Sequence, residues 1–229
     1  MKTAIITGAA GSLGQGVVKK FLEDGYQVAG TINHDKPGKE AEKNPQFEQY
    51  SVNLMDEEKS SQFVESVISK YNTIDVAVLT VGGFAMGKVA DTKTSDIVKQ
   101  YRLNFETAYN VARPVFNQMM KQKSGRIFLV GSRPGLDMRN AKGMVAYSLA
   151  KSLIFRLAEL MNDEAKGHDV ITSVIVPSTI DTADNRKAMP DGKYENWVKP
   201  EQIADVILSY CTTAAGIVKE PVIKVYGNA

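Results

Sequence analysis

Short apolar runs alternate along the chain with stretches in which apolar residues recur every three or four positions. Leu13, Val17 and Phe21, for example, fall on one row of a helix. Near-continuous apolar runs are typical of parallel strands that are covered on both faces. Seven runs are predicted as strands: Thr3–Thr7, Tyr26–Ile32, Phe47–Leu54, Ile74–Val81, Arg126–Gly131, Val170–Val176 and Pro221–Tyr226. The alternation predicts a single α/β domain over residues 1–229, with a mostly parallel sheet between two layers of helices.

Some segments fit this alternation less simply. Asp91–Lys123 reads as mostly helical, but Pro114 lies inside it and is expected to kink or break the helix. A loop of about fifteen residues precedes Tyr147. Asp181–Trp197 is polar with no clear period, and a helix is predicted over Pro200–Thr213.

Composition narrows the classes of function. A net charge of +2 over 229 residues gives no preference for nucleic acid or an anionic membrane. The one cysteine, Cys211, rules out an intrachain disulfide framework and lies in an apolar run, so we interpret it as a core residue. His34 and His168 lack metal-ligand spacing, so no metal site is predicted. No apolar run approaches the ~20 residues that span a bilayer, and the N-terminal run is too short for a signal peptide. We therefore expect a soluble, cytoplasmic protein.

Glycines follow the first predicted strand, at Gly8, Gly11 and Gly14, and a helix and a second strand come next. This is the order of elements in a dinucleotide-binding unit. The glycines allow a tight turn and close approach of a pyrophosphate, which the helix N-terminus attracts. A tight turn without a ligand is the alternative, and the surrounding strand and helix favour dinucleotide binding.

Tyr147 and Lys151 are the strongest candidates for chemistry. Residues four apart share one face of a helix, so both side chains are expected to point into one cavity. A free phenol has a pKa of ~10, and a neighbouring ammonium lowers the pKa of a phenol. The pair is therefore a candidate acid/base for a carbonyl or hydroxyl oxygen, although the same spacing also occurs on solvated helix faces.

These features resemble the short-chain dehydrogenase/reductase family over essentially the whole chain. The segment from Thr7 to Gly14 resembles the cofactor loop of the family, with Ser12 where many members have glycine. Pro177–Thr182 resembles the segment that holds the nicotinamide carboxamide, whereas Val81-Gly82-Gly83 replaces the usual Asn-Asn-Ala-Gly. The resemblance implies a doubly wound Rossmann domain of about seven strands that acts on a small molecule.

Four residues match the family's catalytic tetrad in order: Asn104, Ser132, Tyr147 and Lys151. By resemblance, Tyr147 exchanges a proton with the substrate oxygen and Ser132 hydrogen-bonds that oxygen. Lys151 lowers the pKa of Tyr147 and contacts the nicotinamide ribose, while Asn104 supports a water for proton exchange. The cofactor-binding residues implied are Gly8, Gly11, Ser12, Leu13, Gly14, Thr31, Asn33, Asn53, Leu54, Val81, Gly82, Gly83, Tyr147, Lys151, Pro177, Ile180 and Thr182.

Two segments resemble a narrower group, dihydropteridine reductase and its relatives. These are Val81–Ala85 and the region from Pro177 to Pro190. That enzyme lacks the tetrad's serine and asparagine, which this chain has, so ordinary carbonyl or alcohol chemistry is favoured over a pteridine-like substrate. The alternatives are a non-catalytic NADP-sensing regulator and an isomerase or dehydratase with a bound cofactor. Phe84, Met138, Met144, Met189 and Trp197 are candidate pocket residues, equally interpretable as core or lid packing.

The second predicted strand bears on the choice between NADP and NAD. An NAD site usually places an acid at the end of this strand, on the ribose 2′-hydroxyl. Here the strand ends without one, and the first acid is Asp35. Candidate donors to a 2′-phosphate are Thr31, Asn33, His34, Lys36 and Lys39. NADP is therefore the predicted cofactor, with NAD as the second possibility.

The two long helices predict self-association. The helices near Asp91–Lys123 and Tyr147–Lys166 carry Phe105, Tyr109, Phe116 and Phe155, more apolar rows than one sheet face covers. By resemblance these helices pair across a two-fold axis, which gives a homodimer or homotetramer.

Overall fold

Seven parallel strands form the central sheet, in the order β3-β2-β1-β4-β5-β6-β7. The computed structural model describes residues 1–33, 44–219 and 221–228. The strands are β1 Thr3–Thr7, β2 Gln27–Ile32, β3 Phe47–Ser51, β4 Val76–Leu79, β5 Ser124–Val130, β6 Asp169–Pro177 and β7 Val222–Val225. The order reverses direction at β1 and β4, which is the topology of a doubly wound, Rossmann-like sheet. The predicted fold class is thereby confirmed.

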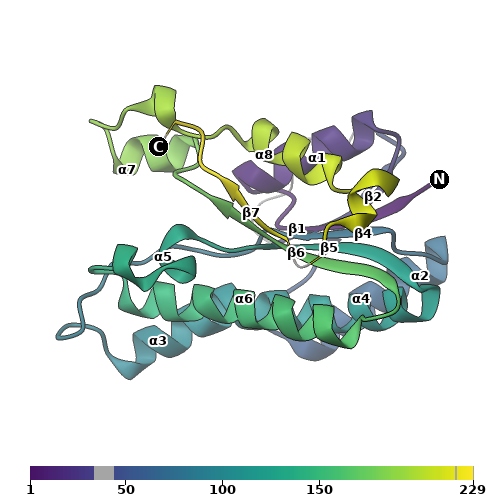
Figure 1. The fold of residues 1–229 in the computed structure, drawn as a ribbon, viewed down its shortest axis with the longest axis horizontal. Coiled ribbons are helices and arrows are strands. Elements are labelled where there is room, and N and C mark those ends of the chain that lie inside the picture. The colour runs from purple at the N-terminus through teal and green to yellow at the C-terminus, as the bar shows by residue number, and fades with distance from the viewer. Residues whose placement is uncertain (34–43, 220, 229) are drawn as a thin grey trace.

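Helices cover both faces of the sheet, as Figure 1 shows with α1 and α8 on one side and α2, α4 and α6 on the other. The α-helices are α1 Ser12–Glu23, α2 Glu57–Tyr71, α3 Thr94–Tyr101, α4 Thr107–Gln122, α5 Arg133–Leu136, α6 Val145–Glu164, α7 Ala183–Ala188 and α8 Pro200–Ser209. Within the described residues, 3₁₀ segments lie at Met138–Asn140, Tyr194–Asn196 and Thr213–Ile217. Among the described residues, no helix combines the length and the apolar character needed to cross a membrane.

The continuous apolar runs follow from this two-sided cover. Successive side chains of a strand point to opposite faces. Ile5 accordingly packs into the core beneath α2, α4 and α6, and the adjacent Ile6 packs into the core beneath α1 and α8. Ile127 and Phe128 of β5 divide between the two cores in the same way. The central positions of these strands are therefore apolar on both faces, with no alternation of apolar and polar residues.

The helix that contains Pro114 is not broken there. α4 runs from Thr107 to Gln122 through the proline, and the fully buried Val111 and Val115 anchor the turns on either side. The irregularity lies earlier, at Arg102–Glu106, where a π-helical segment joins α3 to α4. Such segments are common at functional sites. Of the kink or break expected at Pro114, the break does not occur, because the packing of the neighbouring turns outweighs one lost hydrogen bond.

Two aromatic residues predicted for a self-association surface belong to the core. Phe116 and Phe155 are 8% and 4% exposed and pack under the sheet. Phe105 also packs against this core, whereas Tyr109 is exposed. The apolar rows of α4 and α6 therefore cover the sheet more fully than the sequence pattern suggested.

Candidate active site

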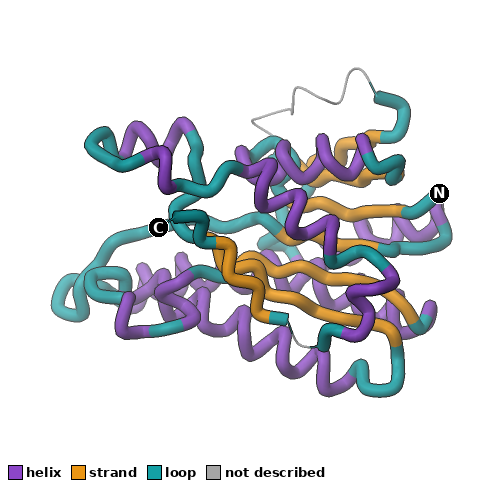
Figure 2. The backbone as a smooth tube through the Cα atoms, turned by 45° about the horizontal axis from the view of Figure 1, so that its top comes forward, coloured by secondary structure: helices purple, strands orange, loops and turns teal. Residues whose placement is uncertain are grey.

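The carboxyl ends of the strands meet at one edge of the sheet, because all strand pairs are parallel. Figure 2 shows helices and loops extending beyond the strands at this edge. The glycine loop follows β1, and the Gly82–Gly83 loop follows β4. Ser132 follows β5 and leads into α5, while β6 leads to α7. Ligands of doubly wound folds bind at this edge.

The glycine loop forms a turn that only glycine permits at two positions. Gly8 has φ of +65°, a left-handed conformation that side chains disfavour. A Cβ on Gly14 would lie 2.0 Å from the carbonyl oxygen of Gly8, so the helix start could not pack on the loop. Gly11 caps α1 without a side-chain hydrogen bond, whereas Asp56, Ser132 and Thr182 cap the helices that follow them. The N-terminus of α1 is thus accessible to an anionic group.

Thr31 supports this loop from below. Its hydroxyl accepts a hydrogen bond from Gly8 N (3.2 Å), and its carbonyl accepts one from Ala9 N (2.8 Å). The residue is 2% exposed. Thr31, a predicted donor to the cofactor's 2′-phosphate, is thus buried beneath the loop and supports the turn. Asn33 is exposed beyond the end of β2, and the other predicted donors, His34, Lys36 and Lys39, lie outside the described residues.

Tyr147 and Lys151 lie one turn apart on α6, as predicted. Lys151 is 5% exposed, and its Nζ donates to the carbonyl oxygen of Val130 (2.7 Å). Burial lowers the pKa of Lys151 to about 8. Burial also raises the pKa of Tyr147, and a hydrogen bond with Ser132 acts in the opposite direction. The sequence predicted that Lys151 lowers this pKa; in the structure burial raises the pKa of Tyr147, and the residue that acts to lower it is Ser132.

Ser132 reaches Tyr147 because α5 packs closely on α6. The Ser132 hydroxyl accepts a hydrogen bond from Gly135 N (3.1 Å) and so caps α5. A Cβ on Gly135 would lie 2.7 Å from Cβ of Lys151, which shows how tightly the two helices meet. The long segment between Ser132 and Tyr147 contains α5 and a 3₁₀ turn and still brings the serine to the tyrosine.

Asn104 lies in the π-helical segment and is 1% exposed. Its Oδ1 accepts from Gly83 N (3.0 Å), and its Nδ2 donates to the carbonyl oxygen of Gly83 (2.9 Å). A Cβ on Gly82 would lie 2.7 Å from Asn104 Oδ1 and 3.2 Å from Lys151 Nζ. Gly82 therefore leaves room for the side chains of both the asparagine and the lysine, and all four predicted tetrad residues lie in one region.

Asn53 and Leu54, the predicted adenine contacts, follow the end of β3. Asn53 is exposed, and its Oδ1 accepts from Met55 N (3.2 Å). Leu54 is 6% exposed, and its carbonyl oxygen accepts from Asn110 Nδ2 (2.9 Å). These bonds hold the turn after β3 against α4. Val81 lies in the loop after β4 and packs against the core.

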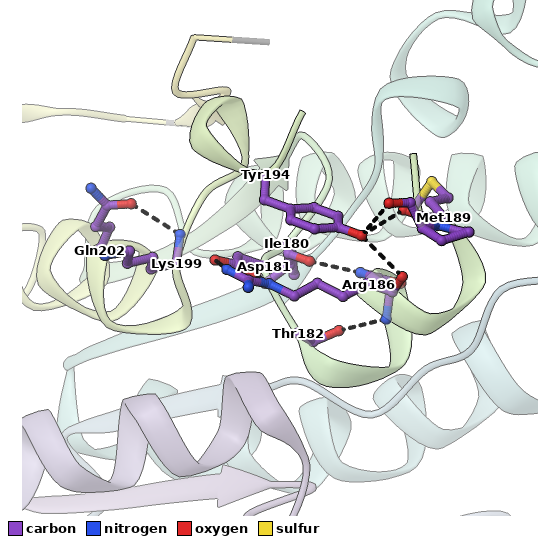
Figure 3. A network of polar contacts seen from close by, with 10 residues as sticks. Ile180, Asp181, Thr182, Arg186, Met189, Tyr194, Lys199 and Gln202 are labelled. Atoms are coloured by element: carbon purple, nitrogen blue, oxygen red, sulfur yellow. Dashed lines mark hydrogen bonds and ion pairs between the residues drawn. The ribbon is translucent and has the colours of Figure 1, made fainter. Parts of the chain in front are cut away.

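The segment after β6 forms a braced turn that the sequence did not predict (Figure 3). Thr182 caps α7 by accepting from Asn185 N (3.1 Å), and Asn185 Nδ2 donates to the carbonyl oxygen of Ile180 (2.8 Å). Arg186 forms a two-pronged ion pair with Asp181, with distances of 2.6 and 2.9 Å. Tyr194 stacks on Arg186 and donates to the carbonyl oxygen of Pro190 (2.7 Å). No periodicity signals such a turn, because its bonds join side chains to a non-repeating backbone.

Both predicted cofactor segments border one hollow. It has a volume of about 430 Å³, with Ser12, Gln15 and Gly16 of α1 on one side and Asp181 and Thr182 on the other. Phe84 contacts the candidate acid/base directly: its ring packs edge-on against the Tyr147 ring, with 5.1 Å between the centroids. Trp197, also considered a pocket residue, instead packs against Tyr194 within the turn after α7.

The residues present fit a dinucleotide. Because Gly14 has no Cβ, the glycine turn packs directly on the start of α1, which has no side-chain cap and borders the hollow. A doubly wound sheet with this turn and with a tyrosine and lysine at its carboxyl edge defines a dinucleotide-dependent oxidoreductase. The model of the short chain dehydrogenase family matches residues 2–193, and the chain belongs to that family. It is an NAD(P)-dependent short-chain dehydrogenase/reductase.

Individual relatives differ in what they act on. The chain is 29% identical to 3-oxoacyl-[acyl-carrier-protein] reductase FabG of Thermotoga maritima, over 99% of this chain and 97% of that protein. It is 24% identical to dihydropteridine reductase of Dictyostelium discoideum, over 93% of this chain and 89% of that protein. The solved structure of ElxO with NADP bound has a TM-score of 0.88 at 21% identity and covers 99% of this chain and 97% of its own.

Proposed function

We propose that the protein transfers a hydride between NADP(H) and a carbonyl group or secondary alcohol of a small molecule, with Tyr147 as the acid/base. The observation that carries the proposal is the convergence of Tyr147, Ser132, Lys151 and Asn104 at the carboxyl ends of β4 and β5. A sensor that only binds the cofactor would need no such proton donor.

The bound nicotinamide supplies or accepts the hydride. During reduction, Tyr147 donates its phenolic proton to the oxygen of the substrate, which takes up negative charge as the hydride arrives. Ser132 hydrogen-bonds the same oxygen and helps to stabilise that charge. Lys151, held by the Val130 carbonyl, supplies positive charge that favours the phenolate after proton transfer. Asn104 holds the Gly82–Gly83 loop beside Lys151 and supports its exchange of protons with water.

The surroundings of Tyr147 favour an apolar substrate. Phe84 is 60% exposed while one edge contacts the Tyr147 ring, so its remaining surface is available to a ligand. Met86, Met138 and Met189 are exposed on the loops that follow β4, β5 and β6. An exposed aromatic ring would also stack on a planar, pteridine-like ring. We therefore propose apolar carbonyl compounds first and conjugated ring systems second.

The proposal of NADP rests on the end of β2. Ala29 to Asn33 contains no acid to accept a hydrogen bond from a ribose 2′-hydroxyl or to repel a 2′-phosphate. We expect the protein to bind NADPH more tightly than NADH in fluorescence titrations at equal ionic strength. Tenfold tighter binding of NADH, ~1.4 kcal/mol, would contradict this choice and indicate that NAD is the cofactor.

Oxidation of NADPH, followed by absorbance against a panel of carbonyl compounds, tests the reaction. The panel should contain β-keto thioesters, aliphatic and aromatic ketones, and a quinonoid dihydropteridine. We expect turnover with at least one apolar member. Binding of NADPH without turnover of any carbonyl would favour a sensor, and conversion of a substrate without net change in NADPH would favour an isomerase or dehydratase.

A further inference from the structure

Gln100 is a buried amide that contacts the tetrad residue Asn104. Gln100 lies near the end of α3, is 5% exposed, and borders a hollow of about 230 Å³ beneath the loop after β4. Its Oε1 accepts a hydrogen bond from Asn104 Nδ2 at 2.9 Å. The two residues are four positions apart, and the second lies in the π-helical segment. The contact therefore joins α3 to the irregular turn that carries Asn104.

The Asn104 amide has more acceptors than hydrogens. Its Nδ2 lies within hydrogen-bond distance of the carbonyl oxygen of Gly83 (2.9 Å), Gln100 Oε1 (2.9 Å) and the carbonyl oxygen of Gln100 (3.2 Å). An amide nitrogen carries only two hydrogens, and the two shortest contacts are to Gly83 and to the Gln100 side chain. The Gln100 side chain thus holds the second hydrogen more closely than the backbone carbonyl of the same residue.

This arrangement fixes the other end of the Asn104 amide. Its Oδ1 accepts from Gly83 N and lies 2.7 Å from the position of a Cβ on Gly82. Lys151 Nζ lies 3.2 Å from the same position. A rotation of the Asn104 amide would therefore move the Gly82–Gly83 loop and change the polar surroundings of the buried ammonium.

We infer that Gln100 is a positioning residue, which acts through Asn104 to hold the Gly82–Gly83 loop and the Lys151 ammonium in place for proton transfer by Tyr147. This inference rests on the proposed function for its effect on turnover. Its effect on Lys151 is independent of any substrate.

Gln100→Met and Gln100→Leu both test the inference because they remove the acceptor and keep a side chain of similar size. We expect kcat to fall about tenfold, equivalent to one hydrogen bond of about 1.4 kcal/mol. The KM for NADPH and the KM for the carbonyl compound should both stay within twofold of the wild-type values. Gln100→Glu keeps an acceptor oxygen at the same place and should recover most of the lost kcat.

Gln122→Met is the matched control. Gln122 Oε1 accepts from Gln118 Nε2, also at 2.9 Å, but at the far end of the sheet, where it also binds Ile74 N. The control should lose thermal stability and keep its kcat. An equal loss of kcat in this variant would overturn the inference, as would unchanged kcat in folded Gln100→Met and Gln100→Leu.

A second measurement tests the role of Gln100 without any substrate. The ¹⁵Nζ resonance of Lys151 in the cofactor-free protein, assigned by its loss in Lys151→Met, should shift in Gln100→Met and remain in place in Gln122→Met. If no carbonyl is reduced by the wild type, the proposed function fails, and this resonance still decides the role of Gln100. An unmoved resonance in Gln100→Met would contradict it.

Discussion

Lys151 shows how the site depends on a residue whose environment the sequence does not reveal. The spacing of Tyr147 and Lys151 predicts that they share a helix face, and they do. Spacing alone does not predict that Lys151 is buried against the Val130 carbonyl. That burial comes from the end of β5, about twenty residues away in sequence, and from the close approach of the short helix α5 at Gly135. The same holds for Gln100: its spacing from Asn104 is that of one helix face, but the sequence does not reveal that both amides are buried against each other.

Burial of Lys151 predicts a particular dependence of stability on pH. The pKa falls from an ordinary ~10.4 to about 8 on folding, so the unfolded chain binds more protons between these values. Burying the protonated lysine lowers the free energy of unfolding. This loss is greatest below pH 8 and becomes smaller as the pH rises, because the lysine then loses its proton in both states. Relative to Lys151→Met, the wild type should therefore gain about 2 kcal/mol of unfolding free energy from pH 7 to 9.5. Urea unfolding of both cofactor-free proteins measures this; a difference independent of pH would contradict the burial of a charged lysine.

At the scale of elements, most of the fold follows from the sequence. The seven apolar runs become the seven strands, and the glycines between β1 and α1 form the expected turn. Boundaries are less accurate: β3 ends at Ser51 and β4 at Leu79, before the predicted Leu54 and Val81. The chain leaves the sheet there while its side chains remain apolar, because Leu54 and Val81 still pack against the core. The turn around α7 is held by Arg186 and Tyr194, and no repeating pattern records such contacts.

The glycine turn gives a prediction for one element. Gly14→Ala places a Cβ against the Gly8 carbonyl, so the loop must move away from α1. We expect affinity for NADPH to fall at least tenfold and stability to fall by about 1–3 kcal/mol, as for other overpacked sites. Gly25→Ala is the control, because Gly25 has φ of +80° but open space around it. The control should lose stability and keep its affinity for NADPH in fluorescence titrations. If both variants bind NADPH with the same affinity, the glycine turn does not contribute to cofactor binding.

At the scale of the whole molecule, the helices that cover one face of the sheet carry apolar side chains on their outer surface. Exposed apolar residues gather on helices α3, α4 and α6: Val98, Tyr101, Tyr109, Leu149, Leu153 and Leu160. The sequence predicted association through these helices from a partly different set of residues, since Phe116 and Phe155 are buried. The width of the helix face that packs against the sheet decides which apolar residues stay exposed. The periodicity of the sequence does not give that width.

We propose that this surface pairs with a second copy of the chain. Light scattering at micromolar concentration should give the mass of a dimer or tetramer. Leu160 is 63% exposed, and Leu160→Glu would bury an unpaired carboxylate in the interface, which is strongly unfavourable. This variant should have a lower mass at equal concentration and retain the fold by circular dichroism. A monomeric wild type would contradict the proposal.

Turnover of Tyr147→Phe, with the best carbonyl from the panel, tests whether Tyr147 is the proton donor. The substitution removes the phenolic proton and keeps the ring that contacts Phe84. We predict that kcat falls at least a hundredfold, within the ~10²–10⁴ typical of general acid–base catalysis, while affinity for NADPH is nearly unchanged. Tyr26→Phe, which removes a hydroxyl from a tyrosine of the α1 and α8 core, should retain full turnover. Near-normal turnover by Tyr147→Phe would contradict the account and exclude Tyr147 as the proton donor.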